Sequence, residues 1–550
     1  MNDKSLSWRP IGKLHEPFND AFNYRTRQEK ELFNKLFLRT DELDRCLAPA
    51  TYFLMGEKGS GKTAYAVYLE NNSFSGTKCQ VTSMTETQYK RFIELKRQGK
   101  LAYSDYANIW RSILLFVAGR MVIQKSKGFI ERITRKFKEI EALVEKWNEH
   151  ALNPEVESAF EAVSRQALSA SVGKEGFGKA EGEFSDQTSE KSPRIRHHLL
   201  ETESDLKKAI ASLSLPDNFI LFIDGIDYRP ESVSYQEYIE CVKGLGEAVW
   251  QLNTEFFGSI RDSKGRIKIM LLIRPDVFHA LNLYNSNSRL QDNAVFLSWA
   301  ATEKEFKGSK LYELSGKYFA TQQSFAVPAQ DAWEHYCEVD NSGSAVFRNL
   351  LKMTFQRPRD ILTFIRIARN MAIKNGHSAS SVLPSDIVRS STFTREFADY
   401  LLGEIRNHAA FYMTQTDFSN YVKFFQFMDG RSRFTMTDFA QAHEKFRRWA
   451  SGEQIKATEY LRDPEALLQY FYDVDVIGYS EAIAGGGETF FHWSNREKSL
   501  NNIAPKVKST GTLLLNPGIA KALDIGKSVT TGTDTNRKLR HRYKRKGRRA

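Results

Sequence analysis

The feature that most constrains this chain is a glycine-rich octapeptide between a short apolar run and a predicted helix. Residues 50–55 read Ala-Thr-Tyr-Phe-Leu-Met, which predicts a buried strand that ends at Gly56. A helix is predicted from about Lys62. The octapeptide matches the phosphate-binding P-loop pattern in full, in the strand-to-helix context that the pattern requires. It consists of Gly56, Glu57, Lys58, Gly59, Ser60, Gly61, Lys62 and Thr63. The alternative is a plain glycine-rich turn.

The residue types of this loop have a chemical reason. Glycines let the backbone wrap closely around phosphate, with amide groups and the helix N-terminus pointing at the anion. Lys62 is expected to reach the β- and γ-phosphates of ATP, and Thr63 to supply its hydroxyl to Mg²⁺. The predicted ligands are therefore ATP and Mg²⁺.

A second apolar run ends in acidic residues. Residues 219–223 are all apolar and lead into Asp224, Gly225, Ile226 and Asp227. A carboxylate at this strand end is expected to lie beside Thr63, so that Asp224 helps to hold Mg²⁺ through a bound water. Asp227, three residues further on, is the candidate for polarising the attacking water. The alternative is an ordinary strand followed by an Asp-Gly turn.

Two arginines complete the predicted site. Arg274 follows the apolar run at residues 267–273. The carboxyl edge of a parallel sheet is where ligands bind, so Arg274 is expected to face the γ-phosphate. The alternative is a strand-capping arginine paired with Asp276. Arg359 begins a later helix, from which it could reach back to the nucleotide, or it could form a plain N-terminal turn with Asp360.

The order of patterns along the 550 residues predicts an α/β, multidomain chain. Apolar runs at residues 50–55, 219–223, 267–273 and 294–299 alternate with helical segments, which predicts a parallel, doubly wound sheet. Three helices and a two-stranded hairpin near the end have the outline of a winged helix. We expect a lead-in at residues 1–48, a P-loop ATPase domain at 49–300 with an insertion at about 105–195, a helical lid at 301–398, a winged-helix-like domain at 399–526 and a disordered basic tail at 527–550.

Charge is concentrated at the C-terminus. The net charge is +12, and residues 536–550 contain nine Lys or Arg and no acidic residue, which leaves +3 for the rest. Such a tail cannot fold alone and would be attracted to nucleic-acid phosphates, or it could serve solubility only. No run approaches the ~20 uninterrupted apolar residues of a membrane span, and no signal core begins the chain, so a cytoplasmic location is expected.

Together, these motifs resemble the AAA+ and STAND superclass of ATPases. Within that superclass, the order of parts is similar to the origin-recognition-type branch and to bacterial P-loop ATPases related to the funZ proteins. The closer likeness rests on residues 471–479, on Phe491-His492-Trp493 and on residues 516–523. The resemblance implies binding of ATP and Mg²⁺ at Lys62, Thr63 and Asp224, a sensing role for Arg274 and a lid sensor at Arg359.

The resemblance also implies conformational switching coupled to self-assembly, as a homo-oligomer, or to a protein partner. One departure matters: many active members carry glutamate beside the magnesium aspartate, where this chain has Gly225. Slow, switch-like hydrolysis is therefore expected, in bacterial defence or in DNA transactions. The alternatives are a DNA-associated AAA+ loader, contacting DNA through the tail and the winged-helix region, and a scaffold that holds nucleotide without useful hydrolysis.

Overall fold

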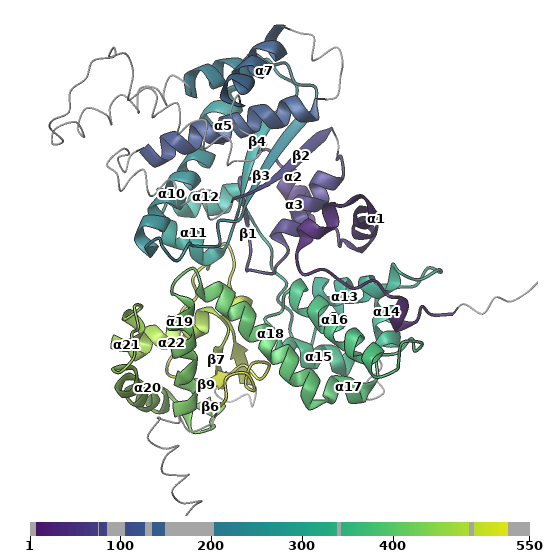
Figure 1. Cartoon of the computed structure of the whole chain (residues 1–550), viewed down its shortest axis with the longest axis vertical. Coiled ribbons are helices and arrows are strands. Elements are labelled where there is room, and N and C mark those ends of the chain that lie inside the picture. Colours follow the sequence, from purple (N-terminus) through teal and green to yellow (C-terminus); the bar gives the residue numbers. More distant parts are fainter. Residues whose placement is uncertain are drawn as a thin grey trace, which may run out of the picture.

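The computed structural model describes residues 7–74, 76–84, 105–126, 135–148, 203–337, 343–482 and 489–525. The basic tail and the Gly-, Ser- and Glu-rich part of the predicted insertion lie outside these residues, as does the glycine run at 485–487. The described part is a mixed α/β protein with a five-stranded parallel sheet and many helices (Figure 1).

The central sheet has the strand order β2-β3-β4-β1-β5. Its strands are β1 (Phe53–Met55), β2 (Thr77–Ser83), β3 (Asn218–Asp224), β4 (Ile267–Ile273) and β5 (Ala294–Phe296). All neighbouring strands run parallel. Successive side chains of β3 enter two different cores, with Phe222 on one face and Ile223 on the other. This burial on both faces explains why β3 and β4 read as continuous apolar runs.

Helices cover both faces of the sheet (Figure 1). One core contains α5 (Asp105–Lys125), α7 (Arg135–Asn148) and α10 (Tyr235–Gln251), and the other contains α3 (Lys62–Asn71). On the side of α3 the N-terminal residues form α1 (Arg27–Leu36) and α2 (Asp41–Leu47). Two short helices, α11 (Pro275–Leu281) and α12 (Ser286–Asn293), join β4 to β5.

Helix α5 is the one described helix that is long and apolar enough to cross a bilayer by length and composition. In this structure 72% of its apolar window is buried inside the protein, where it packs against α10. That burial is typical of the core helix of a soluble protein.

The residues after β5 form a helical region, which we call the lid, and a C-terminal module. The lid contains α13 (Lys310–Ala320), α14 (Ala329–Tyr336), α15 (Gly343–Met353), α16 (Pro358–Lys374) and α17 (Ser385–Arg389), and α18 (Ser391–Ala409) runs from it towards the module (Figure 1). Buried side chains continue without a break from α3 through the lid into the module.

The C-terminal module, residues 415–525, is built on a four-stranded antiparallel sheet of order β6-β9-β7-β8. Its strands are β6 (Arg433–Phe434), β7 (Ile477–Ala482), β8 (Thr489–His492) and β9 (Thr512–Leu515). Its helices are α19 (Gln415–Val422), α20 (Met436–Ala450), α21 (Glu459–Arg462), α22 (Pro464–Asp473) and α23 (Ser494–Glu497). The predicted hairpin is present, but β9 lies between β6 and β7 and makes the sheet larger than two strands.

Candidate functional site

The glycine loop joins β1 to α3 at the carboxyl edge of the central sheet. Gly59 and Gly61 adopt left-handed backbone conformations, with φ of 86° and 99°, that favour glycine. Gly61 caps α3, so the helix begins at Lys62. A Cβ added at Gly56 would lie 2.3 Å from Ser60 Oγ. The loop is further fixed by Trp299, whose Nε1 donates a hydrogen bond to the Ser60 carbonyl oxygen at 2.8 Å. Gly59 and Gly61 are thus required by the backbone geometry of the loop.

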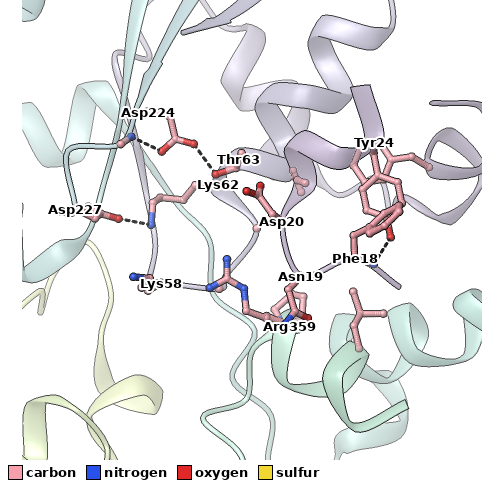
Figure 2. Close-up of a pocket in the computed structure, with 18 of the residues that line it drawn as sticks. Phe18, Asn19, Asp20, Tyr24, Lys58, Lys62, Thr63, Asp224, Asp227 and Arg359 are labelled. Carbon is pink, nitrogen blue, oxygen red and sulfur yellow. Dashed lines mark hydrogen bonds and ion pairs between the residues drawn. The ribbon is translucent and has the colours of Figure 1, made fainter. Parts of the chain in front are cut away.

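Strand order brings Thr63 and Asp224 together from positions 161 residues apart. Because β4 lies between β1 and β3, the carboxyl ends of all three strands meet at one edge. Thr63 Oγ1 donates to Asp224 Oδ2 at 2.5 Å, and the Gly225 amide donates to Asp224 Oδ1 at 2.7 Å (Figure 2). Burial raises the pKa of Asp224, while Thr63 and Lys62 act to lower it. The ionised form of a buried carboxylate is stabilised by a cation that binds beside it.

Lys62 lies between the loop and Asp227. Its Nζ donates to the carbonyl oxygens of Gly56, at 2.8 Å, and Glu57, at 3.3 Å, and lies 3.4 Å from Asp227 Oδ2 (Figure 2). The other oxygen of Asp227, Oδ1, is buried and has no hydrogen-bond partner among the described residues. A buried carboxylate oxygen normally has a hydrogen-bond partner, so Oδ1 is suited to accept a hydrogen bond from a ligand or a water.

A pocket of about 300 Å³ opens over the loop. The predicted residues Lys58, Gly59, Gly61, Lys62, Thr63, Asp224 and Asp227 line it together. Arg359 from α16 lines it as well, and its Nη1 lies 3.1 Å from Glu404 Oε2 of α18.

The opposite wall of this pocket comes from the N-terminal segment, which the sequence analysis did not assign to the site. Phe18, Asn19, Asp20 and Tyr24 all line the cavity (Figure 2). Tyr24 is fixed by the Phe18 amide, which donates to its hydroxyl at 3.1 Å. The aromatic residues at positions 18, 22 and 24 were the local signal for this wall.

Arg274 is not among the residues that line the pocket. Its side chain is 0% exposed, and its Nε and Nη2 donate to the two carboxylate oxygens of Asp276, at 3.0 and 2.5 Å. Although burial raises the pKa of Asp276, Arg274 and His408 hold it below its ordinary range. Burial, followed by Arg274, lowers the pKa of His408 well below its ordinary range. The arrangement is the strand-capping pair that the sequence left as the alternative.

Two acids of the C-terminal module lie behind the loop, Asp475 buried and Asp473 half-buried. Burial raises the pKa of Asp473 to about 6 and that of Asp475 to about 7, with Lys498 acting in the opposite direction in both cases. Asp475 has a left-handed backbone, with φ of 57°, and its Oδ1 accepts a hydrogen bond from the Asn495 amide at 2.9 Å. Asparagine tolerates this backbone and retains an acceptor oxygen.

These features make stability depend on pH at Asp475. Its folded pKa lies above the unfolded value of about 3.9, so its contribution is present in acid and is lost as pH rises through about 7. Asparagine does not titrate, so Asp475→Asn should not show this loss. Relative to wild type, we expect the free energy of unfolding of the variant to rise by about 2–3 kcal/mol from pH 5 to pH 8. Urea unfolding of both proteins at the two pH values measures it. An equal difference at both values would mean that Asp475 does not titrate in this window.

The comparison with known families concerns the lid. Residues 317–402 match the FunZ-associated C-terminal helical domain. The match runs from the end of α13 into α18 and includes Arg359, which lines the pocket. No curated protein matches the chain. The match therefore supports the likeness to funZ proteins in the lid and does not extend to the central sheet.

Proposed function

We propose that this chain is a cytoplasmic ATP-binding switch of the AAA+/STAND type that hydrolyses ATP slowly. The observation that carries the proposal is the hydrogen bond between Thr63 and Asp224 at the mouth of the glycine-loop pocket, beside Lys62. A threonine hydroxyl and a strand-end carboxylate at this place are the pair that holds Mg²⁺ in P-loop nucleotidases. A Mg²⁺ ion bound there would neutralise charge on the β- and γ-phosphates.

The residues of the chain divide the remaining work. The loop amides and Lys62 would bind the phosphates, and exchanging its carbonyl contacts for phosphate would leave Lys62 within the same cavity. Phe18 and Tyr24 give the opposite wall an aromatic surface suited to a nucleobase. Arg359 reaches the cavity from the lid, so a closed lid would add a cation beside the phosphates.

Slow hydrolysis follows from the residue after Asp224. A glutamate at position 225 would need room that the backbone does not provide. Gly225 has φ of 88°, and a Cβ added there would lie 2.5 Å from the carbonyl oxygen of Met84. Asp227 is a remaining carboxylate of the pocket, but it is paired with Lys62. We infer that water activation by Asp227 is weak, which suits a switch better than a motor.

A partner or a second copy of the chain would receive the switch signal. DNA is the second candidate partner, favoured by the nine basic residues of the C-terminal tail. Helix α22 is the last helix before the hairpin, the position from which such modules present a helix to DNA. It is mostly buried and carries Glu465 and Asp473, so the tail is the better DNA contact and the module the better protein contact.

The proposal is tested by two carboxylate variants. We expect Asp224→Asn to lower Mg²⁺-dependent ATP turnover by about 100-fold or more, because the metal site loses its charged ligand. Asp227→Asn is expected to keep ATP affinity and slow hydrolysis by about 10- to 100-fold. Turnover and nucleotide affinity are measured with and without duplex DNA at low salt, with the exposed Asp262→Asn as the control.

The outcomes separate the alternatives. Equal loss of nucleotide affinity in Asp224→Asn and Asp227→Asn would remove their separate roles. Nucleotide binding without turnover in the wild type would favour a scaffold. Turnover that rises strongly with DNA would favour the DNA-associated loader.

A further inference from the structure

The glycine loop is held from outside by the C-terminal module. Lys498, which directly follows α23, places its Nζ 2.8 Å from Oε1 of Glu57, the second residue of the loop. The side chains are 3% and 16% exposed, so the ion pair lies largely out of water. The two residues are 441 positions apart in the sequence. Glu57 therefore points away from the nucleotide pocket and towards the module.

The next two loop residues are held by the lid. Arg357, just before α16, donates from Nη1 to the Lys58 carbonyl oxygen at 2.7 Å. A Cβ added at Gly59 would lie 3.2 Å from the Cβ of Arg359, so lid and loop are in close contact there. Three consecutive loop residues thus take their outside partners from two later parts of the chain.

Lys498 is firmly placed within its own module. Its Nζ also donates to the Asp473 carbonyl oxygen at the end of α22, at 3.2 Å. Burial lowers the pKa of Lys498, but Glu57, Asp475 and Asp276 outweigh it and raise the pKa, so the amine stays charged. Removing one member of a buried ion pair leaves an uncompensated charge, which makes the pair costly to break singly.

The segment that carries Lys498 also contacts the lid. Asn495 donates from Nδ2 to the Phe355 carbonyl oxygen at 2.6 Å, and Arg496 Nη2 lies 3.2 Å from Glu303 Oε1. Movement of the lid against the loop would therefore strain α23 and the residue that follows it. The segment is placed to register the state of the nucleotide pocket.

We propose that Lys498 is a positioning residue of the nucleotide site, which holds the glycine loop through Glu57 and couples nucleotide binding to docking of the C-terminal module. The inference rests on the proposed ATP binding. The coupling has a short path, because the Glu57 carbonyl oxygen accepts a hydrogen bond from Lys62 while its carboxylate binds Lys498. Linkage is reciprocal: if a docked module favours ATP, then ATP favours a docked module by the same factor.

The experiment compares Lys498→Met with Lys508→Met in the full chain. Lys508 lies in the same module and pairs with Glu481 at 3.1 Å, but its side chain is 57% exposed. We expect Lys498→Met to weaken binding of a fluorescent ATP analogue by about ten-fold, within the usual range of coupling, and Lys508→Met to leave it unchanged. Hydrogen exchange adds a readout of docking. ATP should protect residues 473–477 and 494–498 in wild type and much less so in Lys498→Met.

A second variant covers the case in which Lys498→Met does not fold. Glu57→Gln removes the same pair from the more exposed partner, and we expect a similar loss of ATP affinity. The double variant should lose no more than the stronger single variant, because both remove one interaction.

The coupling is overturned if wild type binds ATP and Lys498→Met shows the same ATP affinity and the same protection of the module as Lys508→Met. The proposed ATP binding would stand in that case. A wild-type chain that binds no ATP would instead overturn the proposed function.

Discussion

Lys62→Ala is expected to lower ATP affinity and turnover by at least about 100-fold while the fold stays intact. Lys62 supplies an ammonium group that touches the loop carbonyl oxygens of Gly56 and Glu57 and also faces Asp227. Alanine is the best helix former and Lys62 is the first residue of α3, so the helix should begin at the same place. Isothermal titration with ATP and a steady-state turnover assay measure the loss.

The control for this variant is Lys78→Ala. Lys78 is the second residue of β2 and pairs with Asp217 at 2.6 Å, at the amino-terminal edge of the same sheet. Both substitutions therefore remove one positive charge and one ion pair, but Lys78 does not line the pocket. We expect its ATP affinity to equal that of wild type. Unchanged turnover in Lys62→Ala would mean that the glycine loop has no part in nucleotide chemistry.

The sequence predicted those parts of the fold that rest on continuous apolar runs. The runs at 219–223 and 267–273 became β3 and β4 with nearly the same bounds, because both faces of these strands are buried. Strand β2 was missed. Its sequence, Thr-Lys-Cys-Gln-Val-Thr-Ser, mixes buried and partly exposed positions, as suits a strand at the edge of the sheet. The central position of β9 was missed as well, because its four residues follow a polar loop.

The structure brings together those predicted site residues that lie in one contiguous motif or at a strand end whose place the topology determines. The strand-to-helix loop fixed Lys62 and Thr63, and a strand-end carboxylate can reach Thr63 once the strands are parallel neighbours in one sheet. The pairing of Glu57 with Lys498 could not be predicted, because no local pattern links residues 441 positions apart. Arg274 shows a different limit: its partner, two residues away, was visible, but the sequence did not say whether the arginine faces Asp276 or the pocket.

The second large effect is expected at this buried pair. Asp276→Asn leaves Arg274 charged and 0% exposed, with one nitrogen, Nη1, that already lacks a hydrogen-bond partner among the described residues. A guanidinium cannot lose its proton in a protein, so the charge remains. We expect a loss of about 3–5 kcal/mol in the free energy of unfolding. The reverse variant, Arg274→Met, should lose less, because the remaining carboxyl group can take up a proton and keep its bond to Tyr412.

The double variant Arg274→Met with Asp276→Asn is expected to recover most of this stability, since it removes both charges together. Denaturant unfolding of the four proteins gives the coupling between the two residues. Asp429→Asn is the comparison, because Asp429 pairs with Lys445 at 3.3 Å while both side chains are more than half exposed, so its loss should be at most about 1 kcal/mol. Additive losses at Arg274 and Asp276 would contradict a buried pair.

Turnover of the refolded double variant then tests the predicted sensing role of Arg274. If ATP hydrolysis fails while the stability is restored, Arg274 acts on the nucleotide from behind the pocket, and the pair with Asp276 is its resting position.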